Sequence, residues 1–150
     1  MVCLGNICRS PLAEGLLRKK IYNHSLTWSV DSCGTANYHI GSPPDSRMIA
    51  TAAIYGTDIS NLKARQFSQS DFEKYDIIYV MDKSNYANVA RIAQNELHRN
   101  KVRLLLNDWK PSSNLEVPDP YYGTEDDFKR VYELLDEALE HILNKLKSEK

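Results

Sequence analysis

The sequence lacks the features that mark membrane, secreted and nucleic-acid-binding proteins. No apolar run approaches the length of a membrane span, and no signal peptide precedes Cys3. The net charge of −1 gives no general attraction to nucleic acid or to an anionic membrane, so neither is expected as a partner. Three cysteines are an odd number and a poor disulfide framework, which favours a reducing compartment, and we expect a cytoplasmic protein.

The spacing that metal sites need is missing too. Cys3 and Cys8 do not form a Cys-x2-Cys pair, and Cys33 is distant from both. No pair of histidines completes a set of four ligands, and no histidine falls in a catalytic motif. We therefore expect no metal and no cofactor, and we assign the histidines to surface or structural positions: His24, His39, His98 and His141.

The chain has the composition of one globular domain, with 150 residues of which 42% are hydrophobic and 26% charged. Apolar residues at helical spacing predict helices over 10–23, 84–97 and 125–147 and a helical turn over 70–73, and Asp45 is placed to cap another helix. Apolar or alternating runs predict strands over 28–32, 76–82 and 101–106. Strands that alternate with helices imply a parallel sheet covered on both faces, with ligands bound at the carboxyl ends of its strands.

The first eleven residues are the most informative stretch. Cys3 is followed after five residues by Arg9, and a helical pattern begins directly afterwards. A loop that leads from a strand into a helix directs backbone N–H groups at one point and suits an anion such as phosphate. Arg9 offers a planar fork for two phosphate oxygens. Cys3 is the expected nucleophile, because the field that attracts phosphate also stabilises a thiolate.

Three other residues of this stretch have expected structural roles. Gly5 permits a backbone conformation that a side chain would forbid. Ser10 can cap the helix, and Pro11 suits its first turn. Cys-x5-Arg alone is a weak motif, and a strand–turn–helix with a buried structural cysteine is the alternative interpretation.

Two separate blocks of sequence carry a family resemblance. The string Cys-Leu-Gly-Asn-Ile-Cys-Arg-Ser-Pro at 3–11 resembles the phosphate-binding loop of the low-molecular-weight protein tyrosine phosphatases. Asp-Pro-Tyr-Tyr-Gly at 119–123 resembles the acid loop of the same family, more than a hundred residues later and in the expected order. The resemblance covers the whole chain. It implies a single flavodoxin-like α/β domain over 1–150, with a four-stranded parallel sheet in the order 2-1-3-4 and helices on both faces.

The resemblance implies a reaction in two steps. Cys3 attacks phosphorus to give a phosphocysteine, while Arg9 and the loop amides neutralise the phosphate oxygens. A phenolate leaving group needs a proton, and Asp119, held between two prolines, is the candidate acid, although a turn aspartate is the alternative interpretation. Asp119 then activates water to release inorganic phosphate. Because Asp119 must first be protonated, the rate is expected to favour mildly acidic pH.

The resemblance also implies which residues bind the substrate. Ser10 donates a hydrogen bond to the Cys3 sulfur, and Asn6 bonds across the loop, which Ser32 supports. Tyr121 and Tyr38 flank a flat substrate ring, while Ile7 gives the mouth an apolar lining. The expected substrate-binding set is Leu4, Gly5, Asn6, Ile7, Cys8, Ser10, Tyr38 and Tyr121.

The expected partners are phosphotyrosine proteins or peptides, with inorganic phosphate as product and competitive ligand, and the protein is expected to be a monomer or weak dimer. Cys8 lies in the same tight loop as Cys3. Its side chain either only fills space in the packing of the loop, or it forms a reversible disulfide with oxidised Cys3 that protects the nucleophile. Leu62 stands where some animal members carry a histidine, so that part of the supporting network is expected to be absent.

Three other functions compete with this interpretation. An arsenate reductase would need further cysteines, and none follows Cys33. A protein-arginine phosphatase commonly has threonine at the position of Ile7 and lacks the double tyrosine at 121–122. A non-catalytic phosphotyrosine-binding module would be expected to lack the nucleophile or the acid.

The sequence departs from the family at its start. Only Met1 and Val2 precede Cys3, whereas family members usually have several more apolar residues there, which form the central strand. The first strand is therefore expected to be truncated. Either N-terminal residues have been lost from the sequence, or this version is shortened and less stable.

Overall fold

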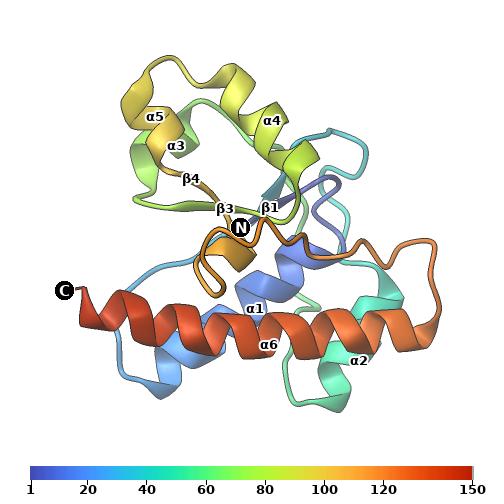
Figure 1. Ribbon diagram of the computed structural model, residues 1–150. Helices are drawn as coiled ribbons and strands as arrows, with labels where there is room; N and C mark the ends of the chain where they lie inside the picture. Colours follow the sequence, from blue (N-terminus) through green and yellow to red (C-terminus); the bar gives the residue numbers. More distant parts are fainter. Residues whose placement is uncertain (150) are drawn as a thin grey trace.

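Four short parallel strands form the sheet, in the order β2-β1-β3-β4 (Figure 1). A computed structural model describes residues 1–149. The strands are β1 (Val2–Cys3), β2 (Cys33–Gly34), β3 (Ile78–Val80) and β4 (Val102–Leu104). The predicted parallel sheet and its order are confirmed, and β1 is two residues long, as is β2.

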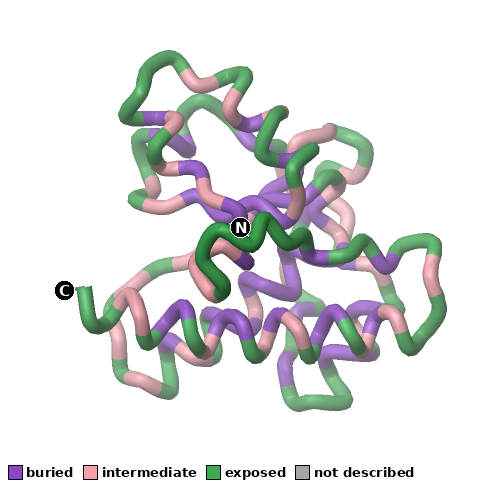
Figure 2. The backbone as a smooth tube through the Cα atoms, viewed as in Figure 1, coloured by how far each residue is buried: buried purple, intermediate pink, exposed green. Residues whose placement is uncertain are grey.

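Helices cover both faces of this sheet. α1 (Arg9–Asn23), α2 (Ser46–Ile54) and the long α6 (Glu125–Ser148) pack together on one side, and α4 (Lys83–Ile92) packs on β3 and β4 on the other (Figure 1). α3 (Ser70–Lys74), α5 (Glu96–Asn100) and the 3-10 helix η1 (Leu105–Asn107) complete the chain. The buried backbone lies at the sheet and along the inner sides of α1 and α6, so the core is divided between the two faces (Figure 2).

The helix predictions succeed where an apolar stripe and a cap coincide. α6 buries one continuous stripe and is capped by Thr124, which forms a capping box with Asp127. Asp45 caps α2 as predicted, accepting a hydrogen bond from the Arg47 N–H. Among residues 1–149, no helix combines the length and apolarity needed to cross a membrane.

Several predicted elements are corrected by the structure. Residues 28–32 are not a strand, because β1 pairs with Cys33 and Gly34, which form β2. The predicted helix over 84–97 is two helices, because Asn95 begins α5 by accepting a hydrogen bond from the His98 N–H. The strands predicted over 76–82 and 101–106 are each three residues long, and the second turns directly into η1.

Candidate active site

The site begins at the carboxyl end of β1, where Cys3 is buried with 3% exposure. The chain loops back and enters α1 at Arg9, so the helix N-terminus lies beside the cysteine. The residue that precedes the helix is Cys8, which makes no side-chain capping hydrogen bond. The prediction that Ser10 caps the helix is therefore wrong. Its Oγ instead lies 3.0 Å from the Sγ of Cys3.

Asn6 fixes the shape of this loop. It is buried, adopts a left-handed φ of +56°, and its Nδ2 donates to Oγ of Ser10 at 2.7 Å and Oγ of Ser32 at 2.9 Å. Its Oδ1 accepts the Arg65 N–H at 3.1 Å. The special backbone conformation predicted at Gly5 belongs to Asn6, which tolerates it because its short polar side chain bonds locally. Gly5 is instead needed because a neighbouring residue leaves little room for a side chain at this position.

The constraint at Gly5 comes from His39. A Cβ atom on Gly5 would lie 3.0 Å from Cδ2 of His39, so a larger residue would crowd the mouth of the site. His39, assigned from the sequence to a surface or structural position, lines the same cleft as the phosphate loop. No motif in the sequence indicates this.

A buried carboxylate supports the loop from behind. Oγ of Ser32 donates to Oε1 of Glu14 at 2.7 Å, and Nη2 of Arg18 donates to Oε2 at 2.6 Å. Glu14 is only 3% exposed. Glu14 was not predicted as a site residue, although an acid on the apolar side of a helix is a signal, because buried charges are found paired.

Arg9 connects the phosphate loop to Asp82, which follows β3, and to the acid loop. Its side chain is 4% exposed, and Nη1 donates to Oδ2 of Asp82 at 2.7 Å and to the Val117 carbonyl at 3.0 Å. Nη2 lies 3.5 Å from Oδ2 of Asp119. Asp82 was also missed. It lies two residues after the end of β3, and residues at the carboxyl ends of neighbouring parallel strands meet.

The acid loop is held by its own backbone and by Arg47. Oδ1 of Asp119 accepts the Tyr121 N–H at 3.1 Å, which turns the carboxyl toward Arg9. Nη2 of Arg47 donates to the Tyr121 carbonyl at 3.0 Å while the same guanidinium pairs with Asp45 at 2.8 Å. The hydrogen bond from Arg47 lowers the pKa of Asp45. Together these contacts tie the acid loop to the start of α2.

A cleft of about 190 Å³ brings most of the predicted site residues together. Asn6 and Ser10 do not line it. They are buried behind the loop and act on its shape and on the sulfur. The lining residues are Cys3, Leu4, Gly5, Ile7, Cys8, Arg9, Tyr38, His39, Asp119, Tyr121 and Tyr122.

All three cysteines are free thiols in the structure. Cys8 lines the cleft but is 5% exposed, and burial raises the pKa of its thiol. Burial also raises the pKa of Cys33 to about 12. Cys8 and Cys33 are therefore protonated at neutral pH. In residues 1–149, no group of three or more His, Cys, Asp or Glu side chains is arranged to hold a metal ion.

Comparisons with known proteins identify the family of the chain. The family model for low molecular weight phosphotyrosine protein phosphatases matches residues 1–150. The chain belongs to this family. The human low molecular weight phosphotyrosine protein phosphatase is 41% identical over 135 residues, which cover 88% of this chain and 84% of the human protein.

Solved structures of phosphatases resemble the fold over almost its full length. A protein tyrosine phosphatase from Entamoeba histolytica, crystallised with Hepes in the active site, has a TM-score of 0.90 and 40% identity and covers 98% of this chain and 94% of its own. YfkJ from Bacillus subtilis has a TM-score of 0.89 at 33% identity, covering 99% and 93%. Family membership supports phosphotyrosine phosphatase activity and confirms the resemblance found in the two sequence blocks.

Proposed function

We propose that this phosphatase hydrolyses phosphotyrosine in proteins or peptides, and small aryl phosphates, through a phosphocysteine on Cys3 without metal or cofactor. The observation that carries the proposal is the meeting of Cys3 and Arg9, from the phosphate loop, with Asp119, more than a hundred residues later, at one cleft. A nucleophile, a cation and an acid in contact with one anion site are what phosphoryl transfer from a phenol requires.

In the first step, the loop amides and Arg9 bind the three equatorial phosphate oxygens. The Cys3 thiolate forms the S–P bond as the bond from phosphorus to the phenolic oxygen breaks, and Asp119 gives its proton to that oxygen. In the second step, Asp119 accepts a proton from a water whose oxygen attacks phosphorus. The S–P bond breaks, and inorganic phosphate and the thiolate are released.

Arg9 is preorganised for its part. Asp82 and the Val117 carbonyl hold Nη1, so the guanidinium plane is fixed before substrate arrives and Nη2 faces the acid. Fixed charges aimed at the reacting oxygens contribute more than mobile ones, because they need no reorganisation during the reaction. The guanidinium then supplies the charge neutralisation that a metal ion supplies in other phosphatases.

The walls of the cleft favour an aromatic substrate. Tyr38 and Tyr121 stand at the mouth with 71% and 36% exposure, and Ile7 of the phosphate loop also lines the cleft. An aryl ring gains from stacking on such side chains. Arginine, serine and threonine phosphates have no ring to stack, and the last two also have short side chains. This supports phosphotyrosine over phosphoarginine.

The test compares a phosphotyrosine peptide with a phosphoarginine peptide of the same sequence. We expect turnover of the first, loss of that turnover in Cys3→Ser, and tight phosphate binding retained in that variant. Asp119→Ala should slow phenyl phosphate by about 10²- to 10⁴-fold and an activated aryl ester much less. Preferred turnover of phosphoarginine would support the arginine phosphatase. Binding of both peptides without turnover would support the binding module.

We propose further that Cys8 is the redox partner of Cys3. Peroxide would oxidise the Cys3 thiolate to a sulfenic acid, and the Cys8 sulfur would displace its oxygen as water to form a disulfide. The raised pKa of Cys8 makes this second step slow at neutral pH. After a brief peroxide treatment, an added thiol reductant should restore more activity to the wild type than to Cys8→Ser. Equal recovery would leave Cys8 with a packing role alone.

A cytoplasmic location, a monomeric or weakly dimeric state and competitive inhibition by inorganic phosphate remain part of the same proposal. Cysteine usage supports the location, and the anion-binding loop supports inhibition by phosphate.

A further inference from the structure

The acid loop is fixed just before it begins and exposed where it carries Asp119. Val117 is buried, its N–H donates to the Met81 carbonyl at 2.8 Å, and its carbonyl accepts Nη1 of Arg9 at 3.0 Å. Asp119 and Tyr121, a few residues later, are exposed. An exposed side chain on a loop keeps its conformational freedom unless other groups hold it. The position of the acid therefore depends on the contacts that the loop makes beyond Val117.

The contact between Asp119 and Arg9 is too weak to fix the acid by itself. Nη2 of Arg9 lies 3.5 Å from Oδ2 of Asp119, which is longer than an ordinary hydrogen bond. In the proposed reaction the Arg9 guanidinium also binds the phosphate oxygens, so it divides its hydrogen bonds between the substrate and the acid. A group that does not bind the phosphate is needed to hold Asp119 throughout the reaction.

Arg47, near the start of α2, makes contacts of this kind. Its guanidinium binds both carboxylate oxygens of Asp45, with Nε 3.0 Å from Oδ1 and Nη2 2.8 Å from Oδ2. The Asp45 N–H donates to the Ile7 carbonyl in the phosphate loop at 2.8 Å. Nη2 of Arg47 also donates to the Tyr121 carbonyl at 3.0 Å, and the Tyr121 N–H donates to Asp119 at 3.1 Å. A chain of contacts through Arg47 thus connects the phosphate loop to the acid.

Two aromatic rings hold the Arg47 guanidinium in place. Its Cζ lies 4.7 Å from the centroid of the Phe128 ring in α6 and 5.5 Å from the centroid of the Tyr121 ring. Phe128 is fully buried, so it gives the guanidinium a fixed surface to pack against, and a cation is attracted to the face of such a ring. Arg47 therefore holds Tyr121 both by its carbonyl and by its ring, and Tyr121 lines the cleft.

We propose that Arg47 is a positioning residue for the general acid: it fixes the acid loop relative to the phosphate loop, so that the Asp119 carboxyl faces the oxygen of the leaving group. The inference rests on the proposed function, because that reaction is what requires a proton at this oxygen. Arg47 acts on Asp119 through Tyr121. Its loss should therefore slow the hydrolysis of esters whose leaving group needs a proton and spare esters whose leaving group needs none.

The test compares kcat/KM for phenyl phosphate, whose leaving group needs a proton, with kcat/KM for dinitrophenyl phosphate, whose leaving group does not. Arg47→Met should lower the first about 10- to 100-fold and the second less than about threefold. Arg47→Lys keeps the charge but lacks the planar fork that binds Asp45 and the Tyr121 carbonyl together, so it should behave like Arg47→Met. The ratio of the two constants does not depend on the fraction of folded protein, so partial unfolding cannot produce this change.

A double variant shows whether Arg47 acts through the acid. In an Asp119→Ala background, Arg47→Met should change kcat/KM for phenyl phosphate less than about twofold, because the group that Arg47 positions is already gone. A further tenfold fall in the double variant would mean that Arg47 serves another part of the site, and it would overturn the inference.

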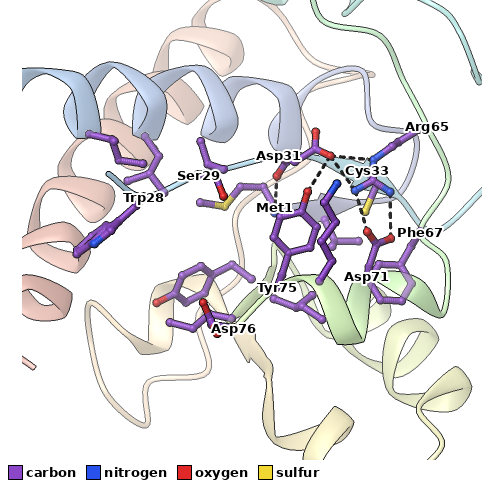
Figure 3. A pocket seen from close by; sticks show the side chains of 18 of the residues that line it. Met1, Trp28, Ser29, Asp31, Cys33, Arg65, Phe67, Asp71, Tyr75 and Asp76 are labelled. Atoms are coloured by element: carbon purple, nitrogen blue, oxygen red, sulfur yellow. Dashed lines mark hydrogen bonds and ion pairs between the residues drawn. The ribbon is translucent and has the colours of Figure 1, made fainter. Parts of the chain in front are cut away.

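Arg65 is the matched control, because it also forms ion pairs but supports the other loop. Its guanidinium binds Asp71 at 3.0 Å and Asp31 at 3.0 Å (Figure 3), and its backbone N–H donates to Oδ1 of Asn6 in the phosphate loop. Arg65→Met should lower kcat/KM for both esters by the same factor and leave their ratio unchanged.

The outcomes separate this inference from the function on which it rests. An equal loss for both esters in Arg47→Met, as expected for Arg65→Met, would overturn the role of Arg47 and leave the proposed function intact. No turnover of either ester by the unsubstituted chain would overturn the proposed function, and the inference with it.

Discussion

The Oγ of Ser10 lies 3.0 Å from the Sγ of Cys3, and it accepts a hydrogen bond from Nδ2 of Asn6 at 2.7 Å. A hydroxyl has one proton to donate, and here that proton can go to the Cys3 sulfur or to the Cys33 carbonyl, 3.3 Å away. A thiolate is the stronger acceptor, so the hydroxyl turns toward Cys3 when the nucleophile is ionised.

Ser10→Ala should therefore weaken the nucleophile without removing it. Hydrogen bonds to charged groups contribute about 1.5 to 3 kcal/mol, so kcat/KM should fall about 10- to 100-fold. Alkylation of Cys3 by iodoacetate should slow in parallel. The exposed Ser113→Ala should change neither rate. Unchanged alkylation in Ser10→Ala would mean that the hydroxyl serves only the Cys33 carbonyl.

Gly34 limits the space behind the phosphate loop. A Cβ atom there would lie 2.7 Å from the Leu4 carbonyl oxygen and 3.1 Å from the Asn6 nitrogen, both backbone atoms that cannot rotate away. Gly34→Ala should displace the loop, lower kcat/KM at least about tenfold and reduce stability by about 1 to 3 kcal/mol, measured by urea unfolding.

Gly41→Ala is the matched control for this change. Gly41 has a φ of +84°, and no atom lies within 4 Å of an added Cβ. The substitution should cost about 1 to 2 kcal/mol of backbone strain and leave kcat/KM unchanged. Equal loss of activity in both variants would show that stability, not loop position, controls the rate.

The strand order followed from the family resemblance that two local motifs carry, and the position of the phosphate loop between β1 and α1 followed from the local strand–loop–helix pattern. The strand predicted over 28–32 failed for a physical reason: alternation reports which side chains are buried, but a strand also needs a neighbour to pair with. β1 pairs with Cys33 and Gly34 and not with residues 28–32. The break between α4 and α5 depends on the cap at Asn95, which competes with the helical pattern around it.

The missed site residues depend on contacts between distant parts of the chain. Asp82 matters because Arg9 reaches across to it, and Glu14 matters because Ser32 and Arg18 converge on it. The left-handed residue was expected at Gly5 because glycine is the residue best suited to it. Asn6 takes that conformation instead because three hydrogen bonds fix its side chain.

Substitutions at Glu14 and Arg18 should show that the buried carboxylate contributes more to stability than its exposed partner. Glu14→Ala removes the acceptor of the Ser32 hydroxyl and leaves a cavity, so stability should fall by about 2 to 4 kcal/mol. Arg18 is 56% exposed in its side chain, and Arg18→Met should cost less than about 1 kcal/mol. The neighbouring Lys19→Met is the control for surface charge. Urea unfolding measures all three, and equal losses in the first two would contradict this division.

Asp108 should make the protein sensitive to acid. Burial raises the pKa of this carboxyl, but hydrogen bonds from Tyr79, Arg103 and Lys145 outweigh burial and hold the pKa below its ordinary value of 3.8. A folded-state pKa below the unfolded one stabilises the fold above 3.8, and this contribution is lost as the pH falls through the lower value. Asp108→Asn should therefore be less stable by about 1 to 3 kcal/mol near neutral pH, with the gap closing below 3.8. The exposed Asp126→Asn should follow the wild type throughout a series of urea unfolding curves. A gap that stayed constant into acid would mean that Asp108 acts through packing and not through its charge.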